Sequence, residues 1–360
     1  MSKHVRLPFV WAIFLLFAAL TIETDSTHAA STTVSYKVVD LGTLEQAVSG
    51  MVYGPNSSGA VVGGTVGFGL GNRAFLLKPD RLENLVGLPG TDWGVARGIN
   101  DKTTVVGSSN GANAIRAFLW TSAGGIRDLG ALPGDSGSEA YGINTYDEVV
   151  GYSSGPSGIE AVLWTSDGKI QSLGKLRDGD YSRGFAINGG GDVVGSSGSS
   201  GSPGGARAFL WTRNAGMQDL GTLPGDTNSE AFSVNSPAEV VGYSSGSVGT
   251  RAFFWSRSAG MITLGTLPGG DYSRAIAIND RGDVVGTSGS SLGARAFLWT
   301  RSRGMQDLNQ LIPGTNDFVL MEALGVNNLG VILAIGRDDD DHGDGHHHHE
   351  FSTRVFLLYP

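Results

Sequence analysis

Residues 273–309 read SRAIAINDRGDVVGTSGSSLGARAFLWTRSRGMQDLN, and this stretch decides the fold. It contains four short apolar runs, which are Ser273–Ile278, Asp283–Thr287, Arg295–Thr300 and Gly304–Leu308. Each run is about five residues long, is rich in Val, Ile, Phe or Trp, and is bounded by Gly, Asn or Pro, as is typical of β-strands. Four strands in about 44 residues match the size of one propeller blade.

The same pattern recurs seven times along the chain. Its third run opens with Arg-Ala-Phe-Leu-Trp or a variant, at 73–77, 116–120, 160–164, 207–211, 251–255, 295–299 and 354–358. Its fourth run carries Asp-Leu-Gly or a relative, at 40–42, 85–87, 128–130, 172–174, 219–221, 263–265 and 307–309. An Asn follows its first run in every copy: Asn56, Asn100, Asn144, Asn188, Asn235, Asn279 and Asn327. The repeat predicts an all-β, seven-bladed β-propeller with four-stranded blades.

The two ends of the repeat array predict how the ring closes. The strand Tyr36–Leu41 has the sequence of a fourth run and stands alone, whereas the last copy ends on its third run, Val355–Leu358. We therefore expect the N-terminal strand to complete the last blade, so that no sheet edge stays open there. Residues 31–360 would then form a single propeller domain.

Most of the repeated polar and aromatic residues have an expected structural role. Each repeated Asn suits a turn in which its side chain bonds the backbone two residues on. The repeated tryptophans are expected in the core between blades: Trp120, Trp164, Trp211, Trp255 and Trp299. The Arg that opens the third run and the Asp of the fourth run are expected to pair across a hairpin.

The first 30 residues are typical of a signal peptide. Lys3 and Arg6 precede an uncharged apolar run over 7–22, and Ala29 and Ala30 suit cleavage. The run is shorter than a typical membrane-spanning helix, and an uncleaved anchor is the alternative. The chain has no cysteine and a net charge of −9, so disulfides are excluded and nucleic acid is an unfavourable partner. We expect a secreted or periplasmic bacterial protein that is monomeric and has no membrane span after cleavage.

Three motifs together resemble the bacterial extracellular HAF-repeat family of β-propeller-like repeats. They are Ala-Phe-Leu-Trp, the segment Gly-Met-Gln-Asp-Leu-Gly-Thr-Leu-Pro-Gly at 216–225, and Ile-Asn-x-x-Gly-x-Val-Val-Gly at 278–286. The His of the family motif is Arg in six copies of this chain and Glu160 in one. The resemblance implies an exported repeat protein and brings no reaction with it.

One position carries an unusual charge pattern. Five residues before the Asn, five consecutive copies have alternating charges: Glu139, Arg183, Glu230, Arg274 and Glu322. On neighbouring inner strands these residues would meet at one mouth of the central channel. They predict either a ring of ion pairs that fixes blade order or a polar mouth that binds a sugar or an acid.

The loop between the second and third strands of the last copy carries an Asp/His-rich insert over 337–350. Its candidate metal ligands are Asp338, Asp340, His342, Asp344, His346, His347, His348, His349 and Glu350. Imidazoles suit Zn²⁺, Cu²⁺ or Ni²⁺, whereas clustered carboxylates suit Ca²⁺. A solvated low-complexity loop is the alternative.

No enzyme motif is present: the sequence has no nucleophile elbow, no metalloprotease His-Glu pair and no phosphate loop. We assign no catalytic residue. The preferred interpretation is a binding module that presents its loop-rich face to a protein or glycan. The alternatives are a metal-binding envelope protein that uses the Asp/His insert, and a carbohydrate-binding or carbohydrate-active propeller with Glu139, Glu230 and Glu322 near its axis.

Overall fold

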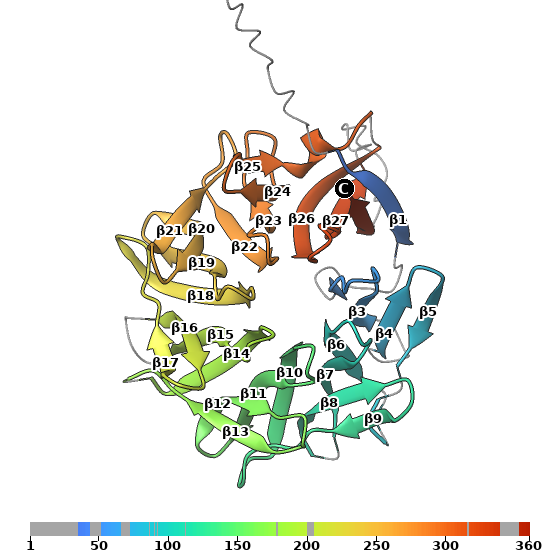
Figure 1. The fold of residues 1–360 in the computed structure, drawn as a ribbon, viewed down its shortest axis with the longest axis vertical. Coiled ribbons are helices and arrows are strands. Elements are labelled where there is room, and N and C mark those ends of the chain that lie inside the picture. Colours follow the sequence, from blue (N-terminus) through green and yellow to red (C-terminus); the bar gives the residue numbers. More distant parts are fainter. Residues whose placement is uncertain are drawn as a thin grey trace, which may run out of the picture. The chain divides into compact units, whose positions relative to one another are not determined.

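A computed structural model describes residues 35–43, 52–65, 73–85, 87–89, 91, 93–111, 113–177, 179–199, 205–314, 317–338 and 353–360. These residues form seven antiparallel four-stranded sheets arranged as the blades of a β-propeller (Figure 1), as the sequence predicts. Within this part of the chain the helical content is one 3₁₀ turn, η1 (Leu308–Leu311), and no helix is long and apolar enough to cross a membrane. The predicted signal peptide, 1–30, lies outside the described residues.

The strands follow one another from the channel outward in each blade. Blade 1 holds β2 (Val52–Tyr53), β3 (Val61–Thr65), β4 (Arg73–Lys78) and β5 (Arg81–Asn84). Blade 2 holds β6 (Gly94–Ile99), β7 (Val105–Asn110), β8 (Ile115–Thr121) and β9 (Gly125–Asp128). Blade 3 holds β10 (Gly137–Ile143), β11 (Val149–Gly155), β12 (Gly158–Trp164) and β13 (Ile170–Gly174). Blade 4 holds β14 (Tyr181–Ile187), β15 (Val193–Gly198), β16 (Ala206–Thr212) and β17 (Gly216–Asp219). Blade 5 holds β18 (Asp226–Val234), β19 (Val240–Gly246), β20 (Gly249–Ser256) and β21 (Gly260–Gly265). Blade 6 holds β22 (Ser273–Ile278), β23 (Val284–Ser288), β24 (Arg295–Thr300) and β25 (Gly304–Asp307). Blade 7 holds β26 (Phe318–Val326), β27 (Ile332–Asp338), β28 (Arg354–Tyr359) and, outermost, β1 (Lys37–Thr43).

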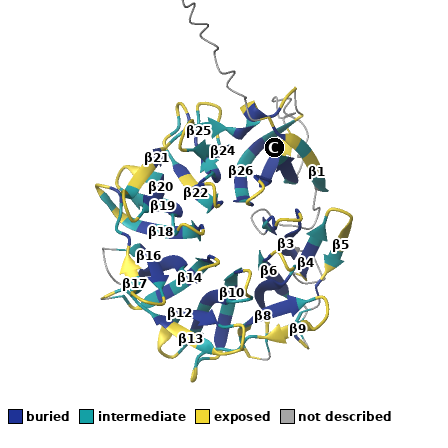
Figure 2. Cartoon of the chain, viewed as in Figure 1, coloured by how far each residue is buried: buried dark blue, intermediate teal, exposed yellow. Residues whose placement is uncertain are grey.

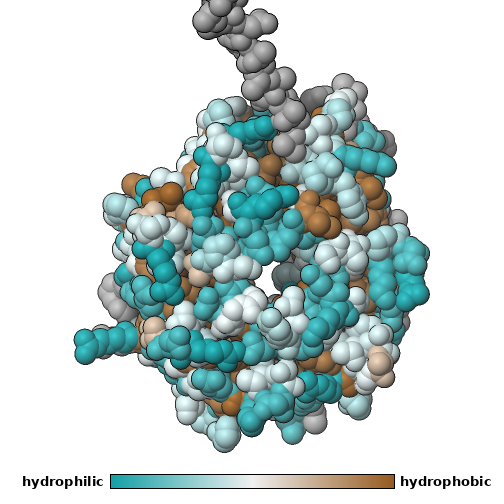
Figure 3. Space-filling model, in the orientation of Figure 1, coloured by the Kyte–Doolittle hydropathy of each residue, from teal (hydrophilic) through white to brown (hydrophobic). Residues whose placement is uncertain are grey.

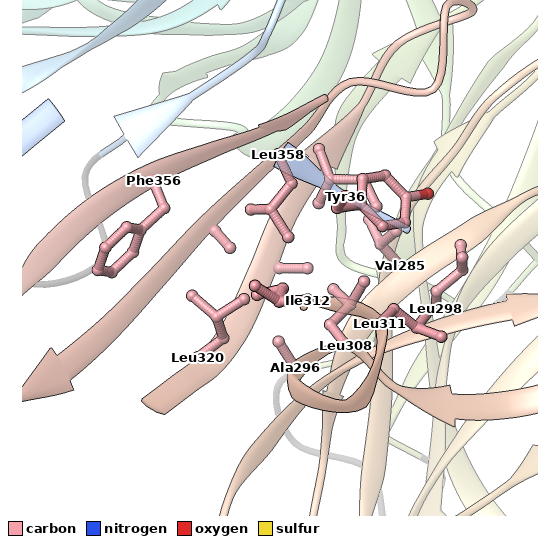
Figure 4. Close-up of a cluster of buried hydrophobic side chains, with 13 residues drawn as sticks. Tyr36, Val285, Ala296, Leu298, Leu308, Leu311, Ile312, Leu320, Phe356 and Leu358 are labelled. Atoms are coloured by element: carbon pink, nitrogen blue, oxygen red, sulfur yellow. The ribbon is translucent and has the colours of Figure 1, made fainter. Parts of the chain in front are cut away.

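Both ends of the chain build blade 7, as the strand count predicts. Strand β1 pairs antiparallel with β28, and Val39 lies opposite Leu357. Tyr36, just before β1, is buried among side chains of blades 6 and 7 (Figure 4), and its backbone N–H donates to the carbonyl of Leu311 at 2.9 Å. The guanidinium of Arg354 in β28 also bonds the carboxylate of Asp40 in β1. The N-terminal strand is therefore held by a sheet ladder, an apolar cluster and an ion pair.

Apolar layers between neighbouring blades form the core. The second and third strands are the most buried part of each blade (Figure 2), because their side chains pack on both neighbouring blades. Trp255 illustrates the arrangement, since it is 6% exposed and shares a cluster with Leu210 of the preceding blade. Four of the five repeated tryptophans are buried, and Trp299 is partly buried against the cluster of blades 5 and 6. Their predicted place in the core is confirmed.

Among the described residues the predicted hairpin ion pairs form in four blades. They are Arg116–Asp128 at 3.0 Å, Arg207–Asp219 at 3.4 Å, Arg295–Asp307 at 3.9 Å and, in blade 7, Arg354–Asp40. In blade 5 the position of the Asp is taken by Thr263, and Arg251 pairs instead with Asp226 at 2.8 Å.

The seven repeated asparagines join every blade to the next. In six of the seven turns after the first strand, the Oδ1 atom accepts backbone N–H groups two and four residues on, for example from Leu329 and Val331 to Asn327. Asn235 accepts only the N–H of Glu239 in its turn, because Pro237 has no N–H. The bond two residues on was predicted. The Nδ2 atom also donates to the backbone carbonyl of the equivalent Asn in the next blade, and this link was not predicted. The seven links, 2.9–3.2 Å long, run Asn56, Asn100, Asn144, Asn188, Asn235, Asn279, Asn327 and back to Asn56.

A β-bulge in the first strand explains the glycine of the repeated Val-Val-Gly. In blade 3 the register passes from Ala140 opposite Gly151 to Gly142 opposite Val150, which leaves Tyr141 unpaired. A Cβ on Gly151 would lie 1.9 Å from the carbonyl oxygen of Glu139. Blades 2, 4, 5 and 6 have the same bulge and the same close approach. In these five blades a Cβ at this position would overlap the backbone of the first strand, whereas blade 7 has Ala334 opposite Ala323 at its own bulge.

Candidate binding site at the channel mouth

The five alternating charges lie on the first strands of five consecutive blades: Glu139 in β10, Arg183 in β14, Glu230 in β18, Arg274 in β22 and Glu322 in β26. Each faces the second strand of its own blade, where the partner positions are Tyr152, Ser196, Tyr243, Thr287 and Ile335. The two glutamates of blades 3 and 5 thus lie opposite tyrosines, and the two arginines lie opposite hydroxyl residues. We call this end of the central channel the channel mouth. Figure 3 shows the ring hollowed at its centre.

Bulged residues add aromatic side chains that the sequence analysis did not single out. Tyr141, Phe185 and Phe232 are the unpaired bulge residues of blades 3, 4 and 5. The rings of Tyr141 and Phe185 are 5.6 Å apart, and those of Phe185 and Phe232 are 5.9 Å apart. Arg97 takes the same position in blade 2. These residues could have been found in the sequence, because each lies three positions before the repeated Asn of its blade.

Glu139 is the one mouth glutamate with a close ion-pair partner among the described residues. Arg97 of blade 2 binds its Oε2 atom at 3.0 Å, and the Tyr152 hydroxyl donates to its Oε1 atom. Arg97 also donates to the hydroxyl of Ser108 and lies over the Tyr141 ring at 4.9 Å. The partner of Glu139 is therefore not Arg183 but an arginine that the charge pattern did not include.

The two mouth arginines use aromatic faces rather than carboxylates. Arg183 lies over the rings of Tyr152 and Tyr181, at 5.6 and 5.7 Å, and its Nε atom is buried with no hydrogen-bond partner. Arg274 lies over the Tyr243 ring at 5.1 Å. Neither guanidinium bonds a carboxylate in the described part of the chain, so their charge-assisted donors stay available.

Burial is the main influence on the pKa values of the other two mouth glutamates, Glu230 and Glu322. It raises the pKa of Glu230, against the opposing effects of Arg183, a hydrogen bond from Tyr243, and Arg274. Burial also raises the pKa of Glu322, which is opposed by Arg274 alone. The Tyr243 hydroxyl stays protonated, because burial and the nearby Glu230 raise its pKa to about 12. Glu322, opposite the apolar Ile335, is therefore less compensated than Glu230.

A pocket of about 670 Å³ lies at the channel mouth between blades 6 and 7. We call it the mouth pocket. Its charged lining is Arg274, Glu322 and Arg337, and its hydroxyl groups come from Thr250, Tyr272, Thr287 and Thr353. Met321 and Ile335 supply apolar surface. Residues at or just before the starts of third strands and residues near the starts of first strands meet here, so the loops that precede these strands lie on one face of the ring.

The structure places few of the candidate metal ligands. Arg337 and Asp338, which the sequence assigned to the insert, are the last two residues of β27. The Oδ1 atom of Asp338 is 2.6 Å from the Nη1 atom of Arg354, so this carboxylate already has a partner. The other candidate ligands, from Asp340 to Glu350, lie outside the described residues. Inside them, no group of three or more His, Cys, Asp or Glu could hold a metal ion. Metal binding by the insert stays a prediction.

No protein-family model and no curated protein matches this chain. Solved structures do resemble it. A streptogramin B lyase is 14% identical with a TM-score of 0.53, and the match covers 91% of this chain and 98% of that one. Virginiamycin B lyase from Staphylococcus aureus is 12% identical with a TM-score of 0.55, over 90% and 99% of the two chains. An oligogalacturonate lyase in complex with manganese is 11% identical with a TM-score of 0.54, over 91% and 96%. At these identities the similarity establishes a shared propeller fold.

Proposed function

We propose that this protein is a binding module that takes a small polar ligand in the mouth pocket. The observation that carries the proposal is the lining of that pocket. It combines a poorly compensated carboxylate, Glu322, with two exposed arginines, Arg274 and Arg337, and four hydroxyl groups. Ligand sites in proteins commonly combine a cavity of several hundred Å³ with a few converging polar groups.

The energetics of the mouth favour binding over a purely structural ring. A structural ring would bring each glutamate against an arginine, as happens at Glu139 and Arg97. Glu322 has no such contact in the described residues, and burial of its charge lowers the stability of the fold. Groups with perturbed titration in a cavity are typical of functional sites.

Blocking the pocket without changing its charge tests the proposal. Ala294 lines the mouth pocket, so Ala294→Phe should fill it, whereas Ala215→Phe places the same side chain on an exposed turn. We would screen the unsubstituted chain by thermal shift and by glycan array against sugars, sugar acids and amino acids. The expected result is a ligand whose binding is lost in Ala294→Phe and kept in Ala215→Phe. Ligand binding that survives in Ala294→Phe would contradict the proposal.

We also infer that the protein is exported, on the basis of the N-terminal sequence and the resemblance to HAF-repeat proteins. N-terminal sequencing of the protein purified from its host should give a mature start near residue 31. A start at Met1 or Ser2 would contradict this inference.

A further inference from the structure

The three arginines of the channel mouth differ in how their donors are used. The Nη1 atom of Arg97 donates to the carboxylate of Glu139 and to the hydroxyl of Ser108. Arg183 and Arg274 are held only through aromatic faces, and among the described residues no acceptor bonds either guanidinium. A guanidinium held by ring stacking has lost side-chain freedom while its donors remain unused. Arg274 is exposed and lines the mouth pocket.

The charge of the mouth pocket is opposite in sign to that of the whole protein. Two arginines, Arg274 and Arg337, line it against one glutamate, Glu322, so its net charge is +1 when Glu322 is ionised. The whole chain carries −9. Arg337 is exposed at the end of β27 and has no ion pair with any residue that the structure describes. Such a pocket attracts an anion even though the protein as a whole repels one.

We propose that the ligand of the mouth pocket is a sugar acid, whose carboxylate is bound by Arg274 with help from Arg337. The inference rests on the function proposed above and names its ligand class. A guanidinium matches the planar geometry of a carboxylate and can bind it through two parallel hydrogen bonds. The single excess positive charge matches a monoanionic carboxylate better than a dianionic phosphate ester. The hydroxyls of Thr250, Tyr272 and Thr353 line the pocket where the hydroxylated body of a sugar needs partners.

Glu322 gives the binding a characteristic dependence on pH. A carboxylate placed beside Arg274 competes with Glu322 for the same positive charge. Bound ligand therefore favours the protonated form of Glu322, and binding should take up protons and strengthen as the pH falls.

Three probes that differ only at C6 test the ligand class: D-glucuronate, D-glucose and D-glucose 6-phosphate. Calorimetric titrations at constant ionic strength would compare the unsubstituted chain with Arg274→Gln. Arg257→Gln is the matched control, because it makes the same change on an exposed turn of blade 5, away from the mouth. We expect glucuronate to bind at least tenfold more tightly than glucose. Arg274→Gln should weaken glucuronate binding by about ten- to a hundredfold, the range for a charge-assisted hydrogen bond, and Arg257→Gln should not.

The remaining outcomes separate the two proposals. Glucose binding as tightly as glucuronate, with Ala294→Phe abolishing both and Arg274→Gln abolishing neither, would leave the binding function standing and overturn the sugar acid. Tighter binding of glucose 6-phosphate would also overturn it, in favour of a phosphate ester. If glucuronate does not bind at pH 5 or pH 7, the sugar-acid assignment is wrong. The binding function is then judged by the wider screen with Ala294→Phe.

Discussion

The glutamates at the channel mouth show how local surroundings decide what a charge does. Glu139 lies between Arg97 and Tyr152, both within bonding distance of its carboxylate. Glu322 lies opposite Ile335 on the neighbouring strand and has Arg274 as its nearby positive charge. Side chains of the same type at equivalent positions of the repeat should therefore respond to substitution with opposite signs.

Glu322→Gln should raise the stability of the protein at neutral pH. Burial raises the pKa of Glu322 above its unfolded value, so the folded state favours the proton and stability falls as the pH rises through the folded pKa. Removing the charge removes that loss. We expect the melting temperature to rise by roughly 1–3 °C at pH 7–8, and the gain to vanish below about pH 4, where Glu322 is neutral in both states. Thermal melts from pH 4 to pH 8 would measure it, and a constant difference would contradict the explanation.

Glu139→Gln should lower stability. It removes the negative partner of Arg97, whose side chain is 15% exposed, and weakens the bond from Tyr152. The loss of a partly buried, charge-assisted contact costs about 1–3 kcal/mol. Urea unfolding followed by Trp fluorescence would measure the difference. A neutral effect would mean that the ion pair of Arg97 contributes nothing to the fold.

Single strands show which local features the sequence can predict. The four runs of blade 6 were placed to within one residue, because alternating apolar residues and turn residues mark both ends of each strand. The β-bulge was not predicted, since one extra residue changes no composition and only shifts the register. Its trace in the sequence is the glycine of Val-Val-Gly, which looks like an ordinary turn glycine until the opposite strand is placed against it.

Gly151→Ala tests the bulge. A Cβ there would lie 1.9 Å from the carbonyl oxygen of Glu139, which is backbone, so the first strand of blade 3 would have to shift. We expect a cost of about 1–3 kcal/mol, the usual range for overpacking, because blade 7 accommodates Ala334 at the equivalent position. Gly189→Ala is the control, because its Cβ would meet nothing within 4 Å and it lies in an exposed turn, so its effect should stay within about 0.5 kcal/mol. Equal effects of the two substitutions in urea unfolding would rule out the steric explanation.

At the scale of the whole ring, the sequence predicted connectivity well and the site in part. Seven copies and a displaced fourth strand were enough to predict the blade number and the closure by β1. The periodic charges were predicted at one mouth of the channel. The mouth pocket was not predicted, because its volume depends on the spacing of blades 6 and 7 and on Arg337, which composition assigned to the insert. The repeat pattern predicts the features that all blades have in common, whereas the mouth pocket depends on residues that differ between blades.

The asparagine links offer a test of whether the ring unfolds as one closed unit. The amide of Asn327 donates to the carbonyl of Asn56 at 2.9 Å across 271 positions, and the amide of Asn56 donates to Asn100 at 3.1 Å across 44. Both side chains also accept two backbone N–H groups in their own turns. Asn327→Ala and Asn56→Ala remove similar sets of hydrogen bonds, which differ by one bond that Asn56 accepts from the Ser58 hydroxyl, and we expect a cost of about 2–4 kcal/mol for each. If blades 7 and 1 are joined as firmly as blades 1 and 2, the two costs should agree within about 0.5 kcal/mol, the usual spread for independent sites. Each variant should also unfold in a single transition by circular dichroism and by Trp fluorescence. A much smaller cost for Asn327→Ala would mean that the asparagine link adds little between the first and last blades, and that β1 and the apolar layer between these blades hold the ring shut.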